Sequence, residues 1–151
     1  VMAGVRLARA YVPAMRRRDW GRIVFISSES AINIPAEMVH YGMTKTAQLA
    51  VSRGLAESLA GTGITVNSVL PGPTRSRGVV EFLAKMAAEA GQPVAELERE
   101  FFNRARPSSL IRRFAEPAEI AAMVTYIVSP LASATTGAAL RVDGGIVRNP
   151  F

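Results

Sequence analysis

The sequence contains no cysteine, and only one histidine and two lysines among its 151 residues. Without cysteine the chain has neither a disulfide framework nor a thiolate metal site. The single histidine, His40, cannot form a metal-binding cluster alone, so we expect no metal site and assign His40 to the surface or to packing. No apolar run approaches the roughly 18 residues that a membrane span needs, so we also expect no membrane partner.

The charge balance is basic, with a formal net charge of +6 at pH 7. A basic surface can bind nucleic acid or another polyanion. Sixteen of the eighteen cationic residues are arginines scattered along the chain, and their one short cluster, 16–18, falls at the end of an expected helix. Cations are favourable there because they interact with the helix dipole. We therefore expect no nucleic-acid partner, and a basic nucleic-acid binder is the least favoured of three hypotheses for the function.

Strands and helices are expected to alternate along a chain whose length suits one ordinary domain. Short apolar segments rich in branched residues predict strands at 23–26, 64–70 and 138–142. Apolar residues at helical spacing predict helices at 1–18, 38–60, 79–90, 94–104 and 115–129. Pro13 should bend the first of these helices, because it removes a hydrogen bond and crowds the preceding turn. This pattern is typical of the α/β class.

The segment 21–45, GRIVFISSESAINIPAEMVHYGMTK, carries the strongest functional signal. Its apolar run predicts a buried strand that ends in two serines, and Tyr41 follows the second serine, Ser28, by thirteen residues. Tyr41 and Lys45 are four residues apart, so on a helix both side chains project from one face. Ligands of open α/β sheets bind outside the carboxyl ends of the strands, where Ser28 would lie.

These residue types suit proton transfer to or from an oxygen atom of a substrate. A phenol with a pKa of about 10 is a poor base at neutral pH, but a nearby ammonium group stabilises the phenolate. Lys45 would make Tyr41 a usable general acid/base, and Ser28 would hold a substrate carbonyl or hydroxyl. A surface tyrosine and lysine on an ordinary helix is the alternative. Ser30 is a second candidate hydroxyl, although its spacing to Tyr41 is eleven residues.

The segment GRIVFISS and the run from Tyr41 to Lys45 resemble the active-site segment of the short-chain dehydrogenase/reductases, which are nicotinamide-dependent enzymes with a Rossmann fold. The resemblance continues through VNSVLPG at 66–72 and ends at VDGG, 142–145. It covers nearly all of this chain but only the second half of a typical family member. The resemblance therefore implies that residues 1–151 form the carboxyl-terminal part of a single Rossmann-type domain, with a partial doubly wound parallel sheet of about three strands flanked by helices.

In function, the resemblance implies a cytoplasmic, NAD(P)-dependent oxidoreductase that transfers a hydride between nicotinamide and a small-molecule carbonyl or alcohol substrate. Ser28, Tyr41 and Lys45 would be its catalytic residues, with Tyr41 as general acid/base. The Pro-Gly turn after the second strand would lie against the nicotinamide ring, although taken alone it favours a simple turn. The cofactor-binding residues implied by the resemblance are Tyr41, Lys45, Pro71, Gly72, Thr74 and Ser76.

Two further expectations concern surfaces. The segment at about 74–112 corresponds to the mobile substrate lid of the family, although its large apolar residues also suit ordinary core packing.

The helices 1–18 and 38–60 carry apolar or small residues on more than one side, which favours a homo-oligomer, a tetramer or at least a dimer. In the second helix we expect one set to face the sheet (Ala47, Ala50, Val51, Gly54 and Leu55) and another to extend the apolar surface (Leu49, Ala56 and Leu59).

The sequence has no Gly-rich turn of the kind that binds a dinucleotide pyrophosphate, neither Gly-x-Gly-x-x-Gly nor the family's Thr-Gly-x-x-x-Gly-x-Gly. The half of the sheet that binds adenosine, and that selects NAD or NADP, is therefore expected outside these residues. An enzyme whose other half lies elsewhere is the favoured hypothesis. The alternative is a truncated, cofactor-free family member that acts as a structural or interaction module.

Overall fold

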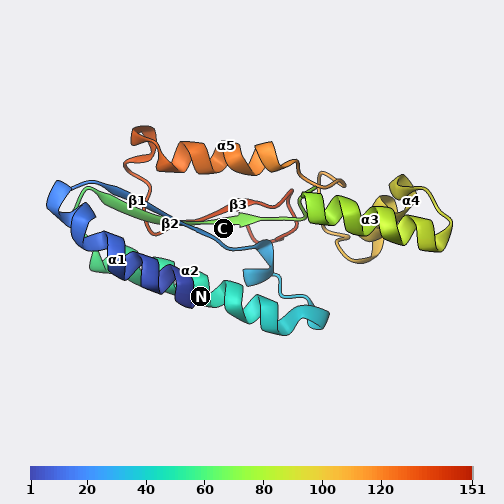
Figure 1. Cartoon of the computed structure of the whole chain (residues 1–151), viewed down its shortest axis with the longest axis horizontal. Coiled ribbons are helices and arrows are strands. Elements are labelled where there is room, and N and C mark those ends of the chain that lie inside the picture. The colour runs from blue at the N-terminus through green and yellow to red at the C-terminus, as the bar shows by residue number, and fades with distance from the viewer. Residues whose placement is uncertain (151) are drawn as a thin grey trace.

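A three-stranded sheet lies between two helical layers in the computed structural model, which describes residues 1–150 (Figure 1). Helices α1 and α2 cover one face of the sheet, and α5 covers the other. The elements in chain order are α1 (Met2–Arg18), β1 (Gly21–Ile26), η1 (Glu29–Ala31), η2 (Ala36–Met38), α2 (Val39–Ser58), β2 (Ile64–Pro71), α3 (Arg77–Ala90), α4 (Val94–Arg104), α5 (Pro117–Val128), η3 (Pro130–Ala132) and β3 (Ala139–Val142).

The strands are parallel in the order β1-β2-β3. Phe25 of β1 pairs with Ser68 of β2, which pairs with Ala139 of β3. Parallel neighbours need crossover connections, and here α2 crosses over one face while α5 lies on the other. This arrangement confirms the prediction of a partial, doubly wound α/β sheet. It also brings the carboxyl ends of all three strands to one edge.

The central strand β2 is buried along its length from Ile64 to Leu70, as expected for a strand covered on both faces. Val66 packs on the α2 side and Val69 on the α5 side. Between them the buried Asn67 side chain donates a hydrogen bond to the Thr135 carbonyl at 2.8 Å and accepts one from the Ala138 backbone at 3.1 Å. Asn67 thereby fixes the turn that leads into β3.

The prediction of a buried first strand was only half right. Phe25 is buried in β1, but Ile23 and Val24 are half-buried and Ile26 is 47% exposed. Within residues 1–150 the strand pairs with β2 alone, so its other edge has no neighbour to cover it. Pro13 lies inside α1, and the helix continues past it to Arg18.

Helix α2 turns only part of the predicted face to the sheet, because Val51 and Leu55 pack against the core as expected but other positions differ. Leu59, expected on the outer surface, is 2% exposed and packs with Phe25 and Val66. Ala50 and Gly54, expected to face the sheet, are exposed. The prediction failed at these three positions because small or apolar residues lie on more than one side of this helix, so their spacing alone does not define the buried face.

Helices α3 and α4 form a hairpin beyond the carboxyl edge of the sheet (Figure 1). Its own small core contains Leu83, Phe102 and Phe114, and the two phenylalanine rings meet edge to face at 5.1 Å. Phe82 of the same hairpin is 60% exposed. Some large residues of the expected lid segment therefore serve as core, and others face solvent. The segment is closed at its base, where Thr74 and Ala115 form a parallel bridge.

Candidate active site

Two serines follow the carboxyl end of β1. The Ser28 side chain is largely buried, and its Oγ accepts a hydrogen bond from the Ser30 backbone at 3.1 Å, which caps η1. A hydroxyl that accepts one hydrogen bond can still donate its own proton. Ser28 is therefore fixed in orientation by the η1 turn while its O–H group remains able to bind an oxygen atom.

Lys45 is held at the same strand end by two interactions. Its Nζ donates a hydrogen bond to the Ile26 carbonyl at 3.1 Å, and the Ser27 hydroxyl donates one to the Lys45 carbonyl at 2.9 Å. One helical turn earlier lies Tyr41, whose ring centre is 5.5 Å from Lys45 Nζ. The structure thus brings Tyr41 and Lys45 to the carboxyl end of β1, next to the serine turn.

Gly42 explains how α2 can approach this turn, and sequence reasoning missed it. The residue is buried, and a Cβ atom there would lie 2.5 Å from Ile34 and 3.1 Å from the Ser30 carbonyl. A glycine inside a helix costs stability relative to alanine, so its presence signals a close approach. Here the close approach is between the start of α2 and the loop that follows Ser28.

The other four residues predicted to bind the cofactor lie at, or just after, the carboxyl end of the neighbouring strand β2. The Gly72 backbone donates a hydrogen bond to Val142 at 3.0 Å, and a Cβ at Gly72 would lie 2.7 Å from the Asp143 carbonyl. This close packing explains the glycine. Thr74 Oγ1 donates to the Gly72 carbonyl at 2.9 Å, and Ser76 caps α3. Pro71 ends β2 itself.

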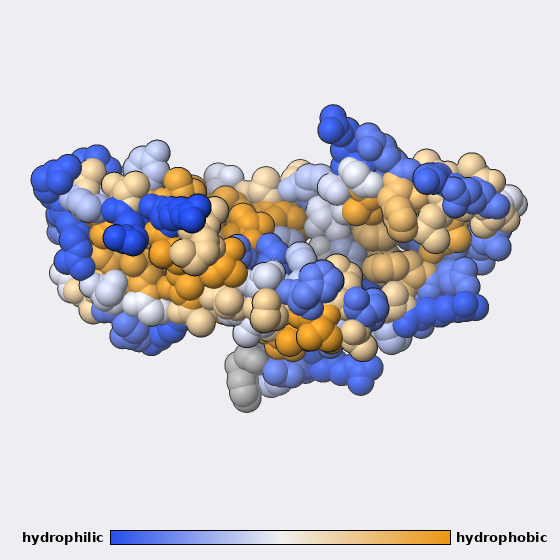
Figure 2. Space-filling model, turned by 60° about the horizontal axis from the view of Figure 1, so that its bottom comes forward, coloured by the Kyte–Doolittle hydropathy of each residue, from blue (hydrophilic) through white to orange (hydrophobic). Residues whose placement is uncertain are grey.

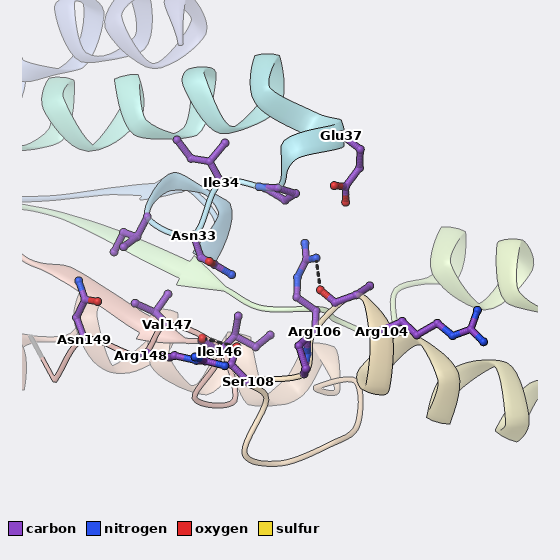
Figure 3. A pocket seen from close by; sticks show the side chains of 14 residues that line it. Asn33, Ile34, Glu37, Arg104, Arg106, Ser108, Ile146, Val147, Arg148 and Asn149 are labelled. Atoms are coloured by element: carbon purple, nitrogen blue, oxygen red, sulfur yellow. Dashed lines mark hydrogen bonds between the residues drawn. The ribbon is translucent and has the colours of Figure 1, made fainter.

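A cavity of about 610 Å³ opens beside these strand ends (Figure 3). Its wall combines the loop 32–35 with Glu37, the segment 104–108 at the end of α4 and the carboxyl-terminal segment 146–149. None of Ser28, Tyr41 and Lys45 lines it, so it flanks the candidate catalytic group rather than containing it. Three segments that are distant in the sequence form this wall, and no local pattern predicts it.

An ion pair that the sequence did not reveal joins the segment 104–108 of this wall to η1, the turn that follows Ser28. Arg106 Nε donates to Glu29 Oε1 at 2.9 Å, and the two side chains are only 12% and 3% exposed. Ser30, the second candidate hydroxyl, donates to Glu29 Oε2 at 2.8 Å. The Ser30 hydroxyl proton is therefore already bound to Glu29.

A second charged cluster anchors the α3–α4 hairpin. Arg75 donates to both carboxylate oxygens of Glu98, at 2.8 and 2.9 Å, and to Glu116 at 3.0 Å. The hydrogen bond to Glu98 raises the pKa of Arg75 above its usual range. Both bonds to Glu98 come from Nη2 and the bond to Glu116 from Nε, so Arg75 links α4 to the residue that precedes α5.

What the structure shows of the lone histidine, of metal clusters and of membrane spans concerns the described residues only. His40 is exposed, in keeping with a surface role. Residues 1–150 contain no cluster of three or more histidine, aspartate or glutamate side chains that could bind a metal ion. No described helix combines the length and the apolar character that a membrane span requires.

Comparisons with known proteins extend over nearly the whole chain. A family described as enoyl-(acyl carrier protein) reductase matches residues 1–147. The uncharacterized oxidoreductase YvaG of Bacillus subtilis is 48% identical over 151 residues, which are 100% of this chain and 57% of that protein. The D-beta-hydroxybutyrate dehydrogenase of Cupriavidus necator is 30% identical over 139 residues, 92% of this chain and 53% of that protein. The chain thus spans about half the length of these relatives.

Solved structures give the same result for the fold. L-sorbose reductase from Gluconobacter frateurii, complexed with NADPH and L-sorbose, superposes with a TM-score of 0.90 at 30% identity, over 99% of this chain and 56% of that one. Actinorhodin polyketide ketoreductase with NADPH has a TM-score of 0.72 at 32% identity, over 87% of this chain and 49% of that one. The family match covers far more than half of the chain. The chain belongs to the short-chain dehydrogenase/reductase family.

Proposed function

We propose that the protein is an NAD(P)-dependent oxidoreductase that transfers a hydride between nicotinamide and a small carbonyl or alcohol substrate. One observation carries the proposal, the position of Lys45. Its ammonium donates a hydrogen bond to the Ile26 carbonyl at the carboxyl end of β1, and it lies beside the Tyr41 ring and next to the serine turn. The two NADPH-bound reductases described above, which share this fold, support the same reaction class.

Tyr41 is the general acid/base in this proposal. In the direction of reduction its hydroxyl donates a proton to the substrate oxygen as negative charge develops there, and it takes the proton back in oxidation. The Lys45 ammonium, next to the ring, stabilises the phenolate that the transfer leaves behind. Because Lys45 is held by the strand end, its charge stays near the phenol throughout the reaction.

Ser28 orients the substrate oxygen. Its Oγ already accepts a hydrogen bond from Ser30, so its own proton is directed to another acceptor. A hydrogen bond from this hydroxyl to the carbonyl oxygen would polarise the carbonyl and strengthen as charge develops. Burial of the side chain limits the number of positions that the hydroxyl can adopt.

The described residues suit the nicotinamide end of the cofactor. Tyr41, Lys45 and the turn residues Pro71, Gly72, Thr74 and Ser76 offer hydroxyl, ammonium and backbone groups at adjoining strand ends. When bound, NADH or NADPH would supply the hydride to the carbonyl carbon. The adenosine end would be held by residues beyond these, in keeping with relatives about twice as long and with the uncovered edge of β1.

The test is consumption of reduced nicotinamide by the protein at its full natural length. NADPH and NADH are each offered with a panel of ketones, aldehydes and ketoses, and the absorbance of the reduced cofactor is followed. We expect consumption that depends on both the protein and a carbonyl compound. The proposal would be refuted by a protein that binds the cofactor but is inactive in both directions. Such a protein would oxidise neither NADH nor NADPH with any carbonyl compound, and would reduce neither NAD nor NADP with any alcohol.

A further inference from the structure

The guanidinium of Arg106 is built into the wall of the cavity. Figure 3 shows its side chain projecting from the segment after α4 toward the loop that carries Ile34 and Glu37. Arg106 uses Nε for Glu29 and Nη1 for the Ala105 carbonyl, at 2.9 and 2.8 Å. Among residues 1–150, no acceptor binds its Nη2. One donor group of an otherwise fixed side chain is therefore available at the cavity wall.

Glu29 determines where that donor lies. Its carboxylate is 3% exposed, and its second oxygen is bound by the Ser30 hydroxyl. A buried carboxylate needs a cationic partner, so Glu29 and Arg106 hold each other in place. The Arg106 guanidinium also lies over the Phe101 ring, at 6.0 Å from its centre. The side chain is consequently preorganised rather than mobile.

The ion pair connects the cavity with the candidate catalytic group. Glu29 directly follows Ser28, and both belong to the η1 turn at the end of β1. Because Ser28 itself does not line the cavity, a substrate that contacts both Ser28 and Arg106 would have to extend past this turn. The cavity volume of about 610 Å³ accommodates a ligand of several carbon atoms.

The charges around the cavity are compensated. Arg106 is paired with Glu29, and Arg104 with Glu100 of its own helix at 2.9 Å. The remaining charged residues of the wall are Glu37 and Arg148, which have opposite signs. Uncharged hydrogen-bonding groups are contributed by Asn33, Ser108 and Asn149. Either group could accept a hydrogen bond from Nη2, but a carboxylate would find little net positive charge here to offset its desolvation, whereas a neutral hydroxyl costs less to desolvate.

We propose that Arg106 determines substrate specificity: positioned by Glu29, it binds an uncharged oxygen of a polyhydroxylated substrate, away from the reacting carbon. Arg106 is thus a binding residue and Glu29 a positioning residue that also cancels its charge. The inference rests on the proposed function for the reacting end of the substrate. It goes further in naming the substrate class, a neutral carbonyl compound with several hydroxyl groups, or the corresponding alcohol.

Binding of two matched probes, sorbitol and gluconate, tests the inference without turnover. They differ in one terminal group, a hydroxyl in sorbitol and a carboxylate in gluconate. Saturation-transfer NMR with the full-length protein measures the affinity for each. We expect sorbitol to bind at least as tightly as gluconate. No binding of sorbitol, or a clear preference for gluconate, would overturn the assignment of a neutral substrate.

Variants then assign the binding to Arg106. Arg106→Lys keeps the charge against Glu29 but removes the free Nη2 donor, so sorbitol affinity should fall about 10-fold. Arg104→Lys is the matched control, because Arg104 lines the same cavity but is 81% exposed and paired within its helix. Its sorbitol affinity should stay unchanged. Equal affinities in the two variants would show that Arg106 does not contact the ligand.

Glu29→Gln provides a readout that a purely structural role would not change. The amide keeps the shape of the side chain but leaves the Arg106 charge uncompensated, so the preference should invert in favour of gluconate. If Arg106→Lys does not fold, the neutral double variant Glu29→Gln, Arg106→Gln replaces it and should lose sorbitol affinity. An unaltered order of preference in Glu29→Gln contradicts the positioning role.

The activity assay separates this inference from the proposed function. If the variants change sorbitol binding as expected but the protein never consumes reduced nicotinamide, the inference stands and the proposed function is wrong. If carbonyl compounds are reduced but binding does not depend on Arg106, the inference alone is wrong.

Discussion

Lys45 Nζ lies 5.5 Å from the centre of the Tyr41 ring and 3.1 Å from the carbonyl oxygen of Ile26. The contact with Ile26 spans 19 residues of sequence and links helix α2 to the end of strand β1. It uses one of the three ammonium protons, so two remain for a ligand. The relationship places a fixed positive charge beside the phenol, as the proposed acid/base chemistry requires.

Tyr41→Phe should nearly abolish turnover while leaving cofactor affinity about unchanged. Removing an acid/base group typically lowers the rate by ~10²–10⁴-fold, because the group acts mainly in the transition state. Steady-state rates and cofactor titrations with the full-length protein check both parts. Tyr11→Phe is the control, since Tyr11 is 60% exposed on α1, away from the strand ends. A Tyr41→Phe variant with nearly normal kcat contradicts the mechanism.

The 151-residue chain alone should bind neither NAD nor NADP tightly. Its residues suit the nicotinamide end, but its sequence has no Gly-rich turn to bind the pyrophosphate. Titration calorimetry with the isolated chain and with the full-length protein compares the two. Binding by the isolated chain in the low micromolar range would overturn this prediction.

The sequence was sufficient to predict the strands and to place the candidate catalytic residues at one strand end, because both patterns are local in the sequence. Branched apolar runs marked all three strands, and the spacing of Ser28, Tyr41 and Lys45 marked one strand end. The Glu29–Arg106 pair could not be predicted, because its partners are 77 residues apart and each is an ordinary charged residue in its local context. The packed face of α2 was predicted only in part: Val51 and Leu55 pack on the core as expected, but Leu59 and Ala50 are both apolar and only the tertiary structure decides which is buried.

Glu119→Gln should make stability less sensitive to acid. Two hydrogen bonds from Arg113, supported by the Glu116 backbone, lower the pKa of Glu119 to about 2 from 4.5. The carboxylate therefore stabilises the fold above about pH 4.5, and this contribution is lost as the pH falls toward 2. Melting temperatures between these pH values should fall less steeply in Glu119→Gln than in the wild type.

Two controls test whether this effect is electrostatic and specific to Glu119: added salt, and the same substitution at another position. Both side chains of the Arg113–Glu119 pair are about half-exposed, so added salt should diminish the difference between variant and wild type. Glu89→Gln, at an exposed position of α3, changes the same charge elsewhere. Identical acid profiles for Glu119→Gln and the wild type at low salt would contradict the prediction.

Asn67→Ala should destabilise the protein strongly. The substitution removes the partners of the Thr135 carbonyl and the Ala138 N–H, which are half-buried, and an unsatisfied group costs up to about 1–3 kcal/mol when water cannot replace the lost partner. Thr65→Val on the same strand is the matched control. The buried Thr65 hydroxyl has no partner among residues 1–150, so its loss should be nearly neutral. Denaturant unfolding measures both, and equal effects would show that the Asn67 bonds contribute little.

The outer side of α1 and α2 supports the prediction of a homo-oligomer. A groove of about 330 Å³ runs between the two helices, and its wall is apolar apart from one arginine: Val5, Ala8, Arg9, Val12, Pro13, Val51 and Leu55. Figure 2 shows apolar residues gathered over this half of the molecule. Ala50 and Gly54, four residues apart and exposed on α2, allow the close approach of a second helix.

Ala50→Arg should therefore reduce the assembly from a tetramer or dimer to a smaller species. A long charged side chain at an exposed, small-residue position leaves the protomer fold intact but prevents two α2 helices from packing around a two-fold axis. Light scattering at micromolar concentration measures the mass of the full-length protein. Ala84→Arg, at an exposed position of α3, is the control and should leave the mass unchanged. A monomeric wild type refutes the oligomer, whereas an Ala50→Arg variant of unchanged mass refutes only the assignment to this helix.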